Sequence, residues 1–332
     1  MERSFLDPPH ADDAARFAPD FGQRVLLTVD TEEEFDWSGD FSAFDYSLDA
    51  IYAIEKFQQF AEGLGAVPVW LVDWPITQSK RVQDVLKGAV AEGKAEIGIQ
   101  LHPWVNPPFK EEVNHRNSYA GNLPADLERD KFLRLRDAIA ENFDCDPQIY
   151  RAGRYGLGSQ SARMLKGAGV AIDTSVRANF DYSAGHGPDY SRHPLHPYWV
   201  DRERQLLELP VTSVYWGMLR RQGRLLQPLV DRIPHLGGVL SRLGLFERIA
   251  LTPEGVTGQE ALRGLDIAID DGLPVIVLSF HSPSLVPGHT PYVENEEDLD
   301  RLYDWLRAVY AYCGQRGVRP TTVSEIMRSV EV

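Results

Sequence analysis

The chain has 332 residues, of which 43% are hydrophobic and 25% charged, a composition typical of a globular protein with a substantial core. Its formal net charge of −15 argues against nucleic acids and anionic membrane surfaces as partners, because both select basic patches. Cys145 and Cys313 are the only cysteines, which excludes a disulfide framework and a thiolate metal cluster.

The first 22 residues carry Pro8, Pro9, Pro19 and several aspartates, and we expect them to form an irregular arm. This segment has no apolar core of signal-peptide length. No apolar run in the chain approaches the roughly 20 residues that a membrane-spanning helix needs. We therefore expect a cytoplasmic protein with reduced thiols.

From residue 24 onward, short apolar runs alternate with amphipathic segments. The apolar runs predict strands at 24–30, 67–72, 96–101, 148–151, 170–175, 206–211, 275–280 and, shorter, 317–320. The helical periodicity predicts helices at 47–64, 82–90, 125–142, 159–168, 259–271 and 296–313. This alternation indicates parallel strand pairing.

Seven or eight strand–helix units suit a closed or nearly closed barrel better than an open nucleotide-binding sheet. Neither a G-x-G-x-x-G motif nor a P-loop lysine follows any predicted strand. We predict an α/β fold with one barrel domain over residues 23–330. An insertion at about 178–250 interrupts it, and its Leu- and Arg-rich part, Met218–Leu251, is expected to be helical.

The predicted strands end in polar residues that can perform chemistry. In chain order these are Asp30 and Glu32, Asp73, Gln100 and His102, Arg151 and Arg154, Asp173, and His281. The carboxyl ends of the strands of a β/α barrel lie on one face, so these side chains should converge on one cleft. Carboxylates, histidines and arginines together favour a metal-assisted hydrolase.

The stretch Arg24–Trp37, RVLLTVDTEEEFDW, contains the densest group of carboxylates. Because side chains alternate along a strand, Asp30 and Glu32 should point the same way. Two such carboxylates repel each other, and a divalent cation or one shared proton would relieve this. An isolated D-x-E could equally be an acidic surface turn; the other polar strand ends are what favour a site.

Five segments carry a resemblance to a known family. In order, TVDTEEEFD, EIGIQLHPW, YRAGRYG, IDTS and VLSFH resemble the motifs of the polysaccharide deacetylases, also called NodB-homology or carbohydrate esterase family 4 proteins. The likeness spans residues 24–325 and is greatest to a subgroup with HPW-x-x-PP and FHSPSL-x-PG. It implies a distorted (β/α)7 barrel that removes N-acetyl groups from amino sugars in glycans with zinc or a similar divalent ion.

The resemblance also implies catalytic roles. Asp30 stands where the family has its catalytic base, and Arg151 where it has the arginine that holds this base. His281 corresponds to the acid that protonates the leaving amine, and Asp173 to the residue that orients this histidine.

The implied metal site departs from the family pattern. Glu32 stands where the family has a metal-binding aspartate. Gln100 and Trp104 occupy the places of the two usual histidines, with His102 between them. We expect a divalent ion, zinc by resemblance, to be held by Glu32, His102, Gln100 and an oxygen of Asp30 or Asp73.

Four residues are candidates for binding the glycan substrate: Trp37, Asp73, Trp104 and Tyr155. The aromatic rings could stack on a sugar, although core packing is the alternative for each. A catalytically degenerate relative that binds a carbohydrate or a partner in the same cleft is the second functional hypothesis, kept open by Gln100. A hydrolase acting on non-sugar amides is the third.

Overall fold

The structure, a computed structural model, describes residues 4–37 and 39–332. Its centre is a curled nine-stranded sheet with the order β10-β1-β2-β3-β4-β5-β7-β6, in which β11 also pairs with β1. The strands are β1 (Arg24–Thr31), β2 (Val69–Val72), β3 (Glu96–Leu101), β4 (Ile149–Ala152), β5 (Ile172–Asp173), β6 (Tyr198–Trp199), β7 (Leu207–Glu208), β10 (Val275–His281) and β11 (Arg319–Pro320).

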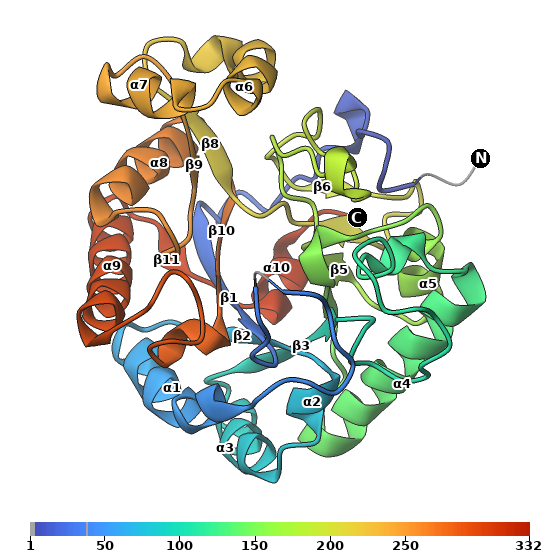
Figure 1. Cartoon of the computed structure of the whole chain (residues 1–332). Coiled ribbons are helices and arrows are strands. Elements are labelled where there is room, and N and C mark those ends of the chain that lie inside the picture. The colour runs from blue at the N-terminus through green and yellow to red at the C-terminus, as the bar shows by residue number, and fades with distance from the viewer. Residues whose placement is uncertain (1–3, 38) are drawn as a thin grey trace.

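All neighbours in this sheet are parallel except β6, which runs antiparallel to β7. Helices cover the outside of the sheet (Figure 1). They are α1 (Ile54–Gly63), α2 (Trp74–Thr77), α3 (Lys80–Ala91), α4 (Ala125–Phe143), α5 (Ser161–Gly167), α8 (Gly258–Asp270) and α9 (Glu296–Gln315). Helix α10 (Val323–Ser329) instead lies inside the ring of helices in Figure 1, and its Val323 and Ile326 join the interior core cluster. The predicted α/β barrel is thereby confirmed. None of the described helices is long and apolar enough to cross a lipid bilayer.

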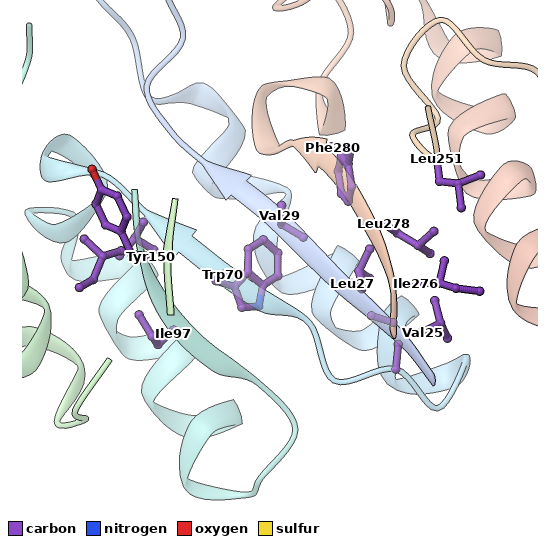
Figure 2. Close-up of a cluster of buried hydrophobic side chains, with 14 of the residues drawn as sticks. Val25, Leu27, Val29, Trp70, Ile97, Tyr150, Leu251, Ile276, Leu278 and Phe280 are labelled. Atoms are coloured by element: carbon purple, nitrogen blue, oxygen red, sulfur yellow. The ribbon is translucent and has the colours of Figure 1, made fainter. Parts of the chain in front are cut away.

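Strand β1 is buried along its whole length, which explains its continuous apolar run. Val25, Leu27 and Val29 pack in the layer between sheet and helices, shown in Figure 2. Leu26 belongs to the other core cluster, on the opposite face of the strand. Because side chains alternate, Asp30 shares the face of Leu26 and points into the barrel.

The barrel interior is narrow at β3. A Cβ atom on Gly98 would lie 2.4 Å from Leu71 Cδ2 and 2.7 Å from Ile149 Cγ2. Any larger residue there would have to displace the side chains of Leu71 and Ile149 on the neighbouring strands β2 and β4. The glycine therefore lets β3 fit between them.

A second, two-stranded antiparallel sheet joins β8 (Ser213–Trp216) to β9 (Glu247–Ala250). Between these strands lie α6 (Gly223–Arg232) and α7 (Leu236–Arg242), which project from the barrel in Figure 1. The expectation that all of 218–251 is helical is wrong at β9. Ile249 and Ala250 are buried there, and residues 247–250 pair with β8 instead.

The described part of the predicted arm packs on the barrel. Phe5 and Phe21 are buried, and Ala15 N–H donates a hydrogen bond to the carbonyl of Pro197. Ala18 N–H likewise donates to Ser329. Residues 1–3 of the predicted arm lie outside the described residues. The division into an arm, 1–22, and one barrel domain, 23–330, stays a prediction.

Candidate active site

The carboxyl ends of the parallel strands surround one cleft of about 320 Å³, the strand-end cleft. Parallel pairing places Asp30 beside His281 and Gln100 beside Arg151. The cleft is lined by Asp30, Glu32, Phe35, Trp37, Phe41, Gln100, His102, Trp104, Tyr119, Ala152, Arg154, Tyr155, Arg177, Tyr182, Val211, Ala250, Leu251, Thr252, Glu254, Ser279, His281 and Tyr292. Most of the predicted site residues are in this set.

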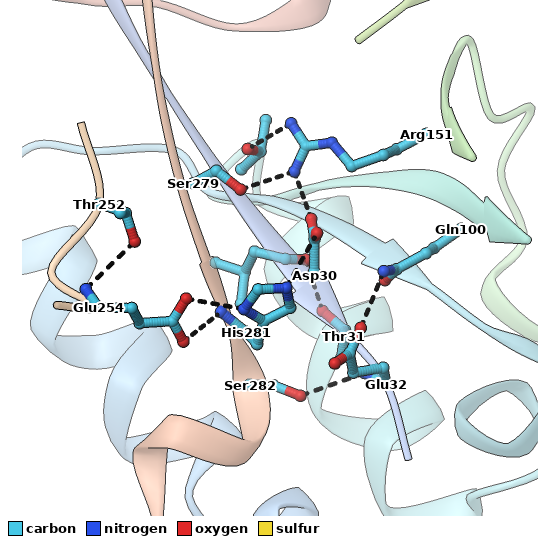
Figure 3. Close-up of polar contacts among 12 residues, drawn as sticks. Asp30, Thr31, Glu32, Gln100, Arg151, Thr252, Glu254, Ser279, His281 and Ser282 are labelled. Atoms are coloured by element: carbon cyan, nitrogen blue, oxygen red, sulfur yellow. Dashed lines mark hydrogen bonds and ion pairs between the residues drawn. The ribbon is translucent and has the colours of Figure 1, made fainter. Parts of the chain in front are cut away.

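Asp30 is held by a buried arginine (Figure 3). Arg151 Nη1 forms an ion pair with Asp30 Oδ1 and donates a hydrogen bond to Ser279 Oγ at 2.8 Å. Its Nη2 donates to Thr28 Oγ1 at 3.0 Å, and its Nε to the Thr174 carbonyl at 2.9 Å. Arg151 is therefore fixed behind the carboxylate and does not line the cleft, which corrects the expectation that it borders it.

The free oxygen of Asp30, Oδ2, lies 3.7 Å from His281 Nε2. On its other side, His281 Nδ1 lies 2.7 Å from Glu254 Oε2. Glu254 Oε1 accepts hydrogen bonds from the His281 backbone N–H and from Ser284 Oγ. The imidazole is thus clamped between two carboxylates.

These carboxylates decide the charge of His281. Burial lowers the pKa of His281, but the negative charges of Glu254, Glu32 and Asp30 outweigh it and raise the pKa to about 10. Burial raises the pKa of Glu254, but the positive charge of His281 and the hydrogen bonds it receives outweigh this and lower the pKa below its usual value. The pair is therefore an imidazolium–carboxylate pair at neutral pH.

Glu32, Gln100 and His102 form a second polar group in the cleft. Gln100 Nε2 donates to Glu32 Oε2 at 2.9 Å and lies 3.2 Å from His102 Nε2. Glu32 Oε2 is 3.4 Å from the same His102 nitrogen. Burial raises the pKa of Glu32 to about 7.

His102 is oriented from behind by Glu33. Its Nδ1 lies 3.0 Å from Glu33 Oε2, while Glu33 Oε1 accepts a hydrogen bond from Trp104 Nε1 at 2.8 Å. A carboxylate on Nδ1 leaves Nε2 with its lone pair toward the cleft, as in many metal-binding histidines.

The donors in the cleft fit a divalent cation. Gln100 Oε1 is buried and has no hydrogen-bond partner in the described part of the chain. If the side-chain amide is turned, Oε1 replaces Nε2 between Glu32 and His102. One carboxylate, one amide oxygen and one imidazole then face a common point, a mixed donor set that suits divalent ions.

Two other groups of possible metal ligands occur nearby. Asp30, Glu32 and His281 offer donor atoms within 4.8 Å of one another, and so do Glu33, Asp73 and His102. In the first group both ring nitrogens of His281 already face carboxylates, those of Glu254 and Asp30. In the second, His102 directs its protonated Nδ1 at Glu33, so we favour the side of His102 that faces Glu32.

Besides Arg151, two further expected site residues do not reach the cleft. Asp73 is fully buried, and its carboxylate accepts hydrogen bonds from the backbone N–H groups of Glu33 and Ile76, capping α2. Asp173 accepts from Ser175, and neither residue lines the cleft. We therefore withdraw a substrate contact for Asp73 and the orienting role for Asp173.

Glu254, not Asp173, contacts His281, and the sequence did not indicate it. Glu254 lies in the loop between β9 and α8, outside any strand end, in a segment that we expected to follow a helix. The only local signal was Pro253 and Gly255 on either side, which indicate a turn but not its place in the fold.

The walls of the cleft are aromatic, as expected for Trp37, Trp104 and Tyr155. Trp37 meets His281 edge-on at 5.0 Å, and Tyr155 stacks on Tyr182 at 5.9 Å. Trp104 is 2% exposed and stacks on His102 at 4.2 Å, so it contributes little surface.

Two arginines, Arg154 and Arg177, also line the cleft and form no ion pair within residues 4–37 and 39–332. Arg177 packs on the Phe180 ring at 4.0 Å, and Arg154 on the Tyr119 ring at 4.2 Å. Their guanidinium groups are therefore positioned by aromatic rings and by hydrogen bonds, from Arg154 to Ser118 and from Arg177 to Tyr182.

Neither a known family model nor any curated protein sequence matches this chain. Solved structures do. A protein named a polysaccharide deacetylase from Mycobacterium smegmatis is 17% identical, with 97% of this chain and 94% of that chain covered and a TM-score of 0.52. A structure of the allantoinase PuuE is 13% identical, with 97% and 93% covered and a TM-score of 0.52.

A protein named a polysaccharide deacetylase from Pseudomonas aeruginosa PAO1 is 13% identical to the chain. The match covers 97% of this chain and 94% of that chain, with a TM-score of 0.51. At these identities the likeness establishes the fold, a NodB-type (β/α) barrel. The activity has to be argued from the site.

Proposed function

We propose that this chain is an amide hydrolase that removes N-acetyl groups from amino sugars of a glycan. One observation carries the proposal: Asp30 Oδ2 and His281 Nε2 face each other across 3.7 Å at one cleft. Arg151 and Glu254, of opposite charge to the residues they hold, fix these two groups from behind. A carboxylate and an imidazolium so placed are a base and an acid.

In this mechanism Asp30 takes a proton from a water molecule, whose oxygen attacks the acetamide carbonyl carbon. Arg151 orients the carboxylate so that only Oδ2 faces the substrate. His281 then gives its Nε2 proton to the amide nitrogen as the C–N bond breaks. The products are acetate and the free amine, and Glu254 keeps the imidazole ring in position.

Glu32, His102 and Gln100 would hold a divalent cation, which we propose to be zinc. When bound, such a cation polarises a carbonyl oxygen and lowers the pKa of water. Glu33 supports this site by fixing the ring orientation of His102. A cation would also neutralise the buried carboxylate of Glu32.

The substrate surface of the cleft combines aromatic rings with the guanidinium groups of Arg154 and Arg177. We propose that Trp37 and Tyr155 contact the faces of sugar rings and that the two arginines bind substrate oxygens. The substrate is therefore a glycan or an amino sugar. A cytoplasmic location stays a prediction.

The second candidate function is glycan binding without catalysis. The hydrogen bond from Gln100 Nε2 to Glu32 favours it, because an amide nitrogen occupies the place where a cation would lie. The arrangement of Asp30 and His281 favours the hydrolase, since simple binding does not require an acid facing a base.

Acetate release from a panel of N-acetylated oligosaccharides, with zinc supplied, tests the proposal. Wild-type protein should release acetate, and the His281→Gln variant should do so at least about 10²-fold more slowly because it lacks the proton donor. Glycan binding without acetate release by the wild type would favour the second function. Release by both proteins at equal rates would contradict the role of His281.

A further inference from the structure

The segment Met218–Leu243, which we call the helical hairpin, contains α6 and α7 and projects from the barrel between β8 and β9 (Figure 1). It holds seven of the fifteen large apolar residues that are exposed in the described part of the chain. They are Met218, Leu219, Leu225, Leu229, Ile233, Val239 and Leu243. Met218 and Leu225 are each 82% exposed. Such a concentration in 26 residues forms a patch rather than scattered exposure.

Helix α6 directs its apolar side outward. Its apolar residues recur at 225, 226, 229 and 230, the spacing of one helix face, and Ile233 follows directly after the helix. Leu225 and Leu229 are exposed, whereas the buried residues of the helix are Gly223 and Gln227. A surface helix normally buries its apolar face against the core, whereas here Leu225 and Leu229, on that face, point outward.

The polar side of α6 makes the contacts with the rest of the protein. Arg224 Nη2 donates a hydrogen bond to the His193 carbonyl at 3.1 Å. Asp231 Oδ1 lies 3.7 Å from Arg248 Nη2. Helix α7 has no buried residue and contacts α6 near Val230 and Gly237. Polar contacts thus help to anchor the hairpin, while Leu219, Leu225, Leu229 and Leu243 stay exposed.

The charge of the hairpin is opposite to that of the whole chain. It contains five arginines and one aspartate in a protein of net charge −15. Arg221, Arg232 and Arg242 are exposed and form no ion pair with any described residue. The net charge of the whole chain therefore conceals a locally basic segment.

We propose that the helical hairpin is a membrane-docking surface for anionic lipids. Leu225, Leu229 and their apolar neighbours enter the interface, and the arginines bind lipid phosphates. Amphipathic helices with a basic polar face and exposed aliphatic side chains bind membranes in this way.

Two observations favour a lipid surface over a protein partner. The hairpin has no Phe, Tyr or Trp, the residues that dominate protein–protein hot spots together with Arg. The acidic remainder of the chain is repelled by an anionic membrane, so only the hairpin can approach it. The inference does not depend on the catalytic role of the cleft.

Sedimentation with vesicles tests this proposal. The full chain should bind vesicles of equal parts phosphatidylcholine and phosphatidylglycerol, and less at high salt, with much weaker binding to pure phosphatidylcholine. The L225E/L229E variant should bind the anionic vesicles at least about tenfold less, because charged groups replace the inserting side chains. The R221Q/R232Q/R242Q variant should lose the preference for anionic vesicles.

The matched control replaces two exposed aromatic residues outside the hairpin, Phe44 at 79% and Tyr52 at 66% exposure, by glutamate. This control should bind like wild type. Circular dichroism should show that every variant is folded, as the changed side chains are on the surface.

The proposal is overturned if wild type does not bind anionic vesicles, or if L225E/L229E binds them equally well. Light scattering tests the alternative that a second copy of this chain covers the helical hairpin. Suppose that wild type does not bind vesicles and is a dimer, and that L225E/L229E is a monomer. The apolar face of α6 is then an interface between two copies of this chain.

Discussion

Asp30 and His281 are neighbours across β1 and β10. Each forms an ion pair with a residue from a distant part of the chain. Arg151 comes from β4, on the far side of the barrel, and Glu254 from the loop after β9. The acid and the base therefore depend on the closure of the whole sheet. Either partner can be removed without touching the two reacting groups.

Glu254 is the residue whose removal is most informative. Its charge is the strongest influence that raises the pKa of His281 to about 10. In Glu254→Gln the histidine pKa should fall, and His281 is the active acid only below its pKa. The alkaline limb of the kcat/KM profile should therefore move to lower pH by about one unit or more.

The control for this experiment is Ser284→Ala, which removes a hydrogen bond to Glu254 without changing its charge. It should move the alkaline limb much less. An alkaline limb at the same pH in Glu254→Gln and wild type would show that Glu254 does not set the charge of His281.

In the proposed metal site, Gln100 should determine how strongly the cation binds. It contacts both Glu32 and His102, so a histidine at this position would point at the same site. Gln100→His should raise zinc affinity about tenfold or more, and Gln100→Leu should lower it, as measured by calorimetry. Equal zinc affinity in all three proteins would place the metal elsewhere.

Sequence reasoning expected every polar strand end to border the cleft, but Arg151, Asp73 and Asp173, which also lie at strand ends, do not line it. Asp30, Glu32, Gln100, His102 and His281 line the cleft, because a barrel brings all such ends together. Glu254 was missed since its place depends on a loop. Asp73 was misjudged because a strand-end aspartate can equally cap the helix that follows.

At the scale of elements, the predictions were best where both faces of a strand are buried. β1 and β10 each contain an apolar run that composition alone identifies as a buried strand. The runs for β8 and β9 are half-exposed, and their pairing depends on each other across the helical hairpin. Periodicity cannot reveal such a distant pairing.

Helix α4 offers a prediction on stability and pH. Glu128 is buried on α4 and accepts a hydrogen bond from Ser161 Oγ on α5, and burial raises its pKa to about 7. In the unfolded chain the pKa of Glu128 is near 4.5. Between about pH 4.5 and 7 the folded state therefore binds more protons than the unfolded state. The free energy of unfolding should therefore fall as pH rises from about 4.5 to 7.

Glu128→Gln removes this titration while keeping an acceptor for Ser161. Above pH 7 the variant should be more stable than wild type by ~2 kcal/mol, and the difference should vanish near pH 4.5. Urea unfolding at both ends of this range measures it, with Glu141→Gln, at an exposed position of α4, as the control. A stability difference that is independent of pH would contradict the assigned pKa.

At the scale of the molecule, the chain combines a buried polar cleft with a basic, apolar hairpin on an acidic body. The barrel was predictable because its repeated strand–helix pattern extends over most of the chain. The hairpin was not, because average charge and composition conceal a local patch. The two features are independent, so the cleft can be tested alone.

The most direct test of the account is the rate of acetate release by Asp30→Asn, measured beside wild type on an N-acetylated oligosaccharide with zinc supplied. The variant keeps the shape of the side chain but cannot accept a proton. We predict a normally folded protein that still binds glycan and releases acetate at least about 10²-fold more slowly. Acetate release at the wild-type rate, or a wild type that neither releases acetate nor binds metal in the cleft, would contradict the account.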